Sequence, residues 1–154
     1  MLETLPISSI LAGSIVAFSL VILGYFAWKT LITSDLFQKG INLAQAQDYQ
    51  GAEAAFRKVI SLNSTNDVVR LFLGDVLNRQ GRVEEAKELF CEVIHRSPKN
   101  PDAYLRLANI LMQQEKREEA KNNLLLAKEL LQKQRQPEKA TRIAQLLEKM
   151  KAKP

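Results

Sequence analysis

The feature that most constrains this chain is a 34-residue period that runs through three consecutive units, 33–66, 67–100 and 101–134. The middle unit places small or apolar residues at set positions, namely Leu73, Gly74, Gly81, Ala86 and Phe90. The first unit matches these positions with Gly40, Ala52 and Phe56, and the third with Leu107, Ala108 and Ala120. Units of this length that repeat in register predict a stack of helix pairs sharing one continuous core.

Composition predicts an all-α fold. Ala, Leu, Glu, Lys, Arg and Gln dominate, Gly and Pro are few outside the expected turns, and strand-forming residues do not alternate. Gly81 separates two predicted helices and can take a positive φ at no steric cost. The expected helices cover residues 35–47, 49–62, 67–80, 83–96 and 118–134.

A segment of 22 residues without charge, Ile7 to Trp28, precedes the repeats. At about 1.5 Å per residue it spans a hydrocarbon core of about 30 Å. It therefore predicts a single transmembrane anchor over residues 7–32, preceded by a short tail, residues 1–6. A cleaved signal peptide fits poorly, because the tail contains Glu3 and no Lys or Arg.

No Gly or Pro separates the anchor from the first repeat, so the anchor could continue as the first repeat helix. Thr33 or Ser34 could equally cap a new helix. Between these alternatives we expect a slight break at this point.

The anchor also carries a stripe of small residues four apart, Ser9, Gly13 and Ala17, which would let another membrane helix approach closely. Lys29 and Lys39 follow the anchor, whereas the tail has no Lys or Arg. Basic residues favour the cytoplasmic side of a membrane. The sequence therefore predicts a single-pass membrane protein with its repeats in the cytoplasm or stroma.

The third unit departs from the period. Glu115 stands where the middle unit has its turn glycine, so a positive φ there would carry strain. A further amphipathic segment, residues 137–151, begins with a proline and predicts a C-terminal capping helix. Its apolar residues, expected to be buried, are Ala140, Ile143, Leu146, Leu147 and Met150.

No catalytic or cofactor-binding constellation is present in the sequence. His95 is the only histidine, so neither a Cys/His nor a two-histidine metal set can form, and neither a phosphate-binding glycine loop nor a G-x-S-x-G motif occurs. Cys91 is expected to be a half-buried packing residue. We therefore expect no enzyme activity, no metal and no cofactor.

The repeats resemble the tetratricopeptide repeat family from about Thr33 to the end of the chain. This resemblance implies a superhelix whose first helices line a concave groove that binds a segment of another protein. The positions that commonly face the groove in that family, carried onto this sequence, include Phe37, Ile41, Ala44, Gln45, Leu71, Asp75, Asn78, Arg79, Leu105, Asn109, Met112 and Gln113. The apolar members among them would form an exposed strip, although Phe37 and Leu71 could instead pack between neighbouring helices.

The subgroup that clamps acidic chaperone tails resembles this chain in fold only. Its clamp needs Lys and Asn at the places that Phe37 and Ile41 occupy here. With one anchor and three repeats, the architecture is similar to small anchored assembly factors of bacteria and plastids, such as photosystem I assembly and cytochrome c maturation proteins.

The resulting hypothesis is a membrane-held scaffold that binds a client protein and aids assembly of a membrane complex. Two alternatives stay open, a permanent subunit of such a complex and a basic surface for anionic lipid or nucleic acid. Residues 128–154 carry eight basic and three acidic residues. No stacking aromatic lies among them, so nucleic acid is not an expected partner.

Overall fold

The computed structural model describes residues 7–152 and the side chains of residues 11–150. Every regular element in this range is a helix, which confirms the all-α fold. The predicted tail, residues 1–6, lies outside the described residues. The helices are α1 (Ile7–Gln45), α2 (Tyr49–Leu62), α3 (Asp67–Arg79), α4 (Val83–Arg96), α5 (Pro101–Gln113), α6 (Arg117–Lys133) and α7 (Pro137–Ala152).

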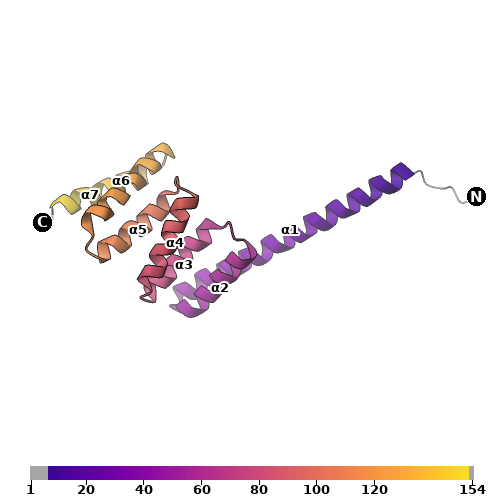
Figure 1. Ribbon diagram of the computed structural model, residues 1–154, viewed down its shortest axis with the longest axis horizontal. Coiled ribbons are helices and arrows are strands. Elements are labelled where there is room, and N and C mark those ends of the chain that lie inside the picture. The colour runs from indigo at the N-terminus through magenta and orange to yellow at the C-terminus, as the bar shows by residue number, and fades with distance from the viewer. Residues whose placement is uncertain (1–6, 153–154) are drawn as a thin grey trace, which may run out of the picture.

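The helices form a stack in which each one packs against the next in sequence, while the N-terminal part of α1 projects away from the stack (Figure 1). Turns of three or four residues join them, so neighbouring helices run antiparallel. α3 also contacts α5 directly. This contact places the first helices of the second and third repeats side by side.

α1 is one uninterrupted helix of 39 residues, about 58 Å long. The expected break near Thr33 is therefore wrong. The Thr33 hydroxyl donates within the helix, to the carbonyl oxygens of Lys29 and Thr30 at 3.0 and 2.9 Å, instead of capping a new helix. No Gly or Pro lies between Trp28 and Phe37, and the helix passes from the apolar segment straight into the first repeat.

Close packing explains the repeated glycines. A Cβ atom at Gly40 would overlap the ring of Phe56, and one at Gly74 would overlap the ring of Phe90. In the third repeat the glycine is replaced by Ala108 and the ring by the smaller Leu124. Both of these side chains are buried, so the methyl group of the alanine occupies space that the phenyl rings fill elsewhere.

The turns that close the helix pairs depend on single left-handed residues. Gly81 has a φ of 80°, and Gln47, Glu115 and Arg135 have φ values of 63°, 61° and 57°. The strain expected if Glu115 had a positive φ therefore applies. A side chain in this conformation carries strain that glycine avoids.

The C-terminal helix caps the stack as predicted. Ala140, Ile143 and Leu147 are buried against the core, and Met150 is partly buried. The prediction that Leu146 is also buried is wrong, because 44% of this residue is exposed. The helical rotation that turns Leu147 inward points its neighbour outward.

Candidate functional site

A hollow of about 270 Å³ opens between α1 and α3. It lies on the surface built by residues 37–45 of α1 together with α3 and α5, which we name the odd-helix face. Its lining residues are Ile41, Ala44, Gln45, Gln47, Phe72, Asp75, Val76 and Arg79. Five of them were predicted groove residues, namely Ile41, Ala44, Gln45, Asp75 and Arg79. The structure thus brings together predicted residues from the first and second repeats.

Helical spacing explains why these side chains meet. Along α1 the lining residues are three and four positions apart, and along α3 they recur at Phe72, Asp75, Val76 and Arg79. Residues with this spacing occupy one face of a helix. Two such faces, presented by neighbouring helices, enclose the hollow.

Aromatic packing makes the apolar wall of the hollow rigid. The ring of Phe72 lies 5.3 Å from that of Phe37, edge to face, and 6.0 Å from that of Phe56. Phe56 is fully buried, and Phe37 is partly buried against the same core. The three rings join α1, α2 and α3, so a ligand would meet a surface that is already ordered.

An ion pair crosses the odd-helix face beside the hollow. The Arg106 Nε donates to the Asp75 Oδ2 at 2.8 Å, and the Arg106 guanidinium carbon lies 5.8 Å from the centroid of the Phe72 ring. Burial raises the pKa of the Asp75 carboxyl above its ordinary value, and the Arg106 charge offsets part of this shift. The negative charge of Asp75 is therefore already matched by a cation of α5.

Arg79 supplies a positive charge at the rim of the hollow. Its side chain is exposed, and its Nη1 lies 3.5 Å from the Tyr49 hydroxyl oxygen. Its guanidinium carbon lies 6.0 Å from the centroid of the Tyr49 ring. No carboxylate in the described part of the chain forms an ion pair with it. This guanidinium can donate to a carboxylate or to backbone carbonyls of a bound segment.

The structure corrects one predicted groove residue. Leu71 is only 3% exposed and belongs to the core, so it cannot contribute to an exposed strip. The alternative in which this residue packs between helices is the correct one.

The remaining predicted residues lie outside the hollow. Asn78 and Leu105 are half-buried, whereas Asn109, Met112 and Gln113 are exposed on α5. Met112 lines a separate hollow of about 120 Å³ with Arg117, Lys149 and Met150. Their binding role stays a prediction.

Sequence reasoning missed Phe72, Gln47 and Val76 in the lining, and Arg106 as the partner of Asp75. The groove positions carried over from the family include Leu71 but not the next residue, Phe72. Counting three residues back from Asp75 along the helix would have found Phe72. The ion pair had no comparable signal, since it joins two helices from different repeats.

The predicted small-residue stripe on α1 contacts nothing in the described part of the chain. A Cβ built at Gly13 would meet no atom within 4 Å, and Ala17 is exposed. The side chain of Ser9 lies outside the described residues. The contact with another membrane helix stays a prediction.

The described titratable residues offer no metal site. Among the described residues, no group of three or more His, Cys, Asp or Glu side chains could hold a metal ion. His95 is exposed in the last turn of α4. The prediction that Cys91 is half-buried is wrong, because it is exposed on the same helix.

A sequence model described as Tetratricopeptide repeat matches residues 43–92 and 79–150 of the chain. The chain belongs to the tetratricopeptide repeat family. The two overlapping matches include α2 to α6 and most of α7, and they begin at Leu43 near the end of α1. A comparison with curated protein sequences found no match.

Solved structures share the tetratricopeptide fold. The type III secretion translocator chaperone SycD of Yersinia enterocolitica is 27% identical, with a TM-score of 0.72 over 79% of this chain and 93% of that one. SycD in complex with a peptide of the translocator YopD is 26% identical, with a TM-score of 0.69 over 78% and 92% of the two chains. The TPR2B domain of yeast Sti1 is 18% identical, with a TM-score of 0.72 over 80% and 99%, and shows the fold alone.

Proposed function

We propose that this protein is a membrane-anchored scaffold whose odd-helix face binds a segment of a client protein and so aids the assembly of a membrane complex. The observation that carries the proposal is the hollow between α1 and α3. It combines an ordered aromatic wall, from Phe72, with an exposed cation at its rim, Arg79. An apolar side chain of a client would fill such a hollow while its backbone or a carboxylate meets the guanidinium.

The likeness to SycD supports this choice of ligand. A chain of the same fold, 26% identical, forms a complex with a peptide of YopD. In the present protein the charge of Asp75 is already matched by Arg106, so the unpaired charge that a client segment meets at the hollow is positive. We expect the bound segment to carry an apolar residue next to an acidic group.

The membrane part of the proposal comes from the N-terminal half of α1. This helix is long and apolar enough to cross a membrane, and its apolar part is not buried in the stack. Tyr25 and Trp28 lie where interfacial aromatics are enriched, and Lys29 follows them. We infer a single membrane pass, with the stack on the cytoplasmic or stromal side.

Photo-crosslinking of the full chain in its own membrane tests client binding. A photoreactive residue replaces Gln45, which is exposed and lines the hollow, or Gln50, an exposed residue of α2 outside it. We expect a discrete adduct from the first position, absent from the second and lost when Arg79→Glu is added. Equal adducts from both positions would reject the odd-helix face as the binding surface.

Two further measurements separate the finer parts of the proposal. Protease added outside intact cells should spare the stack, and digestion from outside would reverse the inferred orientation. Purification in mild detergent should yield the client in variable amounts. A fixed stoichiometry would instead indicate a permanent subunit of a membrane complex.

A further inference from the structure

The stack has two edges of different character. Because neighbouring helices are antiparallel, the turns 63–66, 97–100 and 134–136 share one edge and the turns 46–48, 80–82 and 114–116 share the other. The free part of α1 leaves the stack on the side of the first set (Figure 1). We name these the anchor-side edge and the far edge.

The anchor-side edge lies close to the end of the apolar segment. Leu31 is still 70% exposed, whereas the next residue, Ile32, is partly buried. Ile32 follows Trp28 by four residues, a rise of about 6 Å. With Trp28 at the membrane interface, the edge therefore faces a headgroup layer that is roughly 5–8 Å thick.

Hydrogen bonds between successive turns tie this edge into one surface. The Arg96 Nη1 donates to the Ser64 carbonyl oxygen at 3.0 Å, and the Ser97 hydroxyl donates to the Asp67 Oδ2 at 2.6 Å. The Gln134 Nε2 donates to the Lys99 carbonyl oxygen at 2.8 Å. These bonds hold the three turns together, so the charged residues on them keep fixed positions relative to one another.

The charge differs in sign between the edges. We counted charged residues in each turn and in the four residues on either side of it. The anchor-side edge has six Lys or Arg and three Asp or Glu, whereas the far edge has four Lys or Arg and six Asp or Glu. Among the described residues, the exposed cations with no ion-pair partner within four residues of the anchor-side turns are Lys99, Arg135 and Lys139, and Arg142 follows on α7. On the same criterion the far edge has Arg79 and Lys116, which lie among more carboxylates. On the far edge Arg82 is paired with Glu53 and Glu85.

We propose that the anchor-side edge lies against the anionic phospholipid headgroups of the leaflet from which α1 emerges. The inference rests on the proposed membrane pass of α1 and adds a second contact with the same membrane. Anionic lipids are enriched in the cytoplasmic leaflet, and each Lys or Arg near such a surface raises partitioning about fivefold. Three unpaired cations on one tied edge, with few carboxylates around them, favour a defined orientation of the stack.

This orientation has a consequence for the client. The hollow opens near the far edge, with Ile41 thirteen residues and Gln45 seventeen residues beyond Trp28 along one helix. The hollow therefore stands about 20–25 Å above the interface. A client segment would be held at that height over the membrane and not at its surface.

The test uses the full chain, with Cys91→Ser, reconstituted in vesicles. A fluorophore is attached at Gln132→Cys on the anchor-side edge or at Ala46→Cys on the far edge, both exposed positions. In phosphatidylcholine vesicles with a quarter phosphatidylglycerol, headgroup-quencher lipids should quench the first label and not the second. The first signal should fall in pure phosphatidylcholine and in 0.5 M salt.

Charge variants sharpen the test. Arg135→Gln with Lys139→Gln should lower the ratio of docked to undocked edge roughly 25-fold. The matched control, Lys116→Gln with Lys149→Gln, removes two cations from the far side of the stack and should leave quenching unchanged.

The outcomes separate the two proposals. If alkaline washing releases the unsubstituted chain from the vesicles, the membrane pass fails and the edge proposal falls with it. If the chain stays integral but the Gln132→Cys label is quenched equally in neutral and anionic vesicles, only the edge proposal is overturned. It is also overturned if Arg135→Gln with Lys139→Gln abolishes binding of a single-stranded DNA 20-mer while vesicle quenching persists.

Discussion

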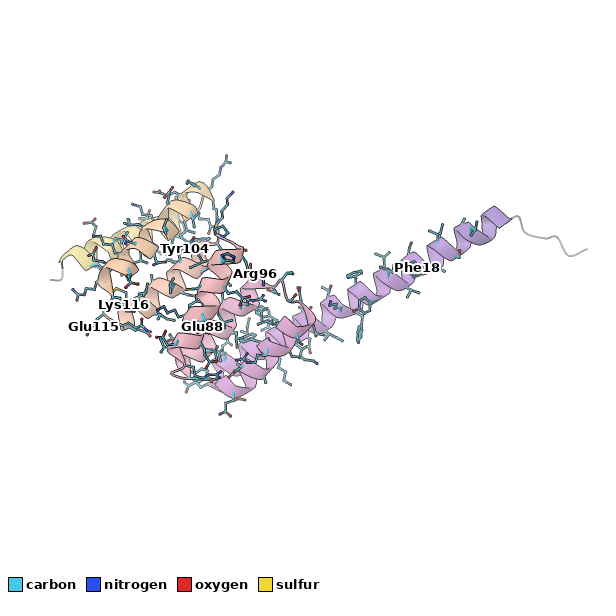
Figure 2. All side chains as sticks on the ribbon, viewed as in Figure 1. Phe18, Glu88, Arg96, Tyr104, Glu115 and Lys116 are labelled. Atoms are coloured by element: carbon cyan, nitrogen blue, oxygen red, sulfur yellow. The ribbon has the colours of Figure 1, made fainter. Side chains whose placement is uncertain are left out.

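The two halves of α1 form one continuous helix but lie in different surroundings. In the outer half, Phe18 and Val21 are each 69% exposed, whereas in the inner half Gly40 is buried beneath the Phe56 ring. Phe18 lies far out along the projecting helix, whereas Arg96 and Tyr104 lie on the stack (Figure 2). The contrast shows that the helical conformation of α1 depends on local sequence. What each half packs against depends instead on its apolar side chains, which a single helix cannot bury by itself.

Removing the outer half should have the largest effect. We expect deletion of residues 1–32 to convert a detergent-requiring protein into a soluble one, because no other described helix is long and apolar enough to cross a membrane. Flotation with vesicles and circular dichroism would measure membrane association and helicity. Retention on membranes after a high-salt wash would show that the outer half is not the sole anchor.

The helix at the opposite end of the stack extends the comparison, because α7 has one packed side and one free side. Leu147 is 6% exposed and Leu146 is 44% exposed. Leu147→Ala should cost about 2–5 kcal/mol, since it leaves a cavity against the core. The adjacent Leu146→Ala should cost well under half of that. Equal melting temperatures for the two variants would mean that α7 is not docked.

Glycine substitutions compare the two halves of α1 directly. Gly40→Ala should destabilise the stack by about 1–3 kcal/mol, because its methyl group overlaps the Phe56 ring. Gly24→Ala in the outer half meets no atom within 4 Å and should leave the melting temperature of the stack unchanged. Both are measured by thermal denaturation in the same detergent. A comparable shift from Gly24→Ala would indicate that the outer half also packs on the stack.

The smallest effect is expected at the junction between the halves. In a continuous helix Thr33→Ala should change stability by no more than about 0.5 kcal/mol, since Ala is the better helix former. If Thr33 capped a separate helix, the same change would cost about 1 kcal/mol. A clear loss of stability would therefore restore the break that the hydrogen bonds of Thr33 argue against.

Much of the fold followed from the sequence because its signals are local. The bounds of α2 and α4 match the prediction, and the turn positions of Gly81 and Glu115 have positive φ values. The spacing of apolar residues and the choice of turn residues depend on only a few neighbouring positions, so they can be recognised within one short segment of the sequence. The candidate hollow was predicted in part, through Ile41, Ala44, Gln45, Asp75 and Arg79.

The sequence by itself determined that this chain forms stacked helix pairs of the tetratricopeptide type after a long apolar segment. Only the tertiary structure decided that Leu71 faces the core, that Phe72 lines the hollow and that Asp75 pairs with Arg106. The reason is that neighbouring apolar residues on one helix gain similar free energy from burial. Which of them is buried depends on how that helix is rotated against its partners. The ion pair likewise joins residues 31 positions apart in the sequence. It depends on how successive repeats pack against each other, which no local sequence pattern specifies.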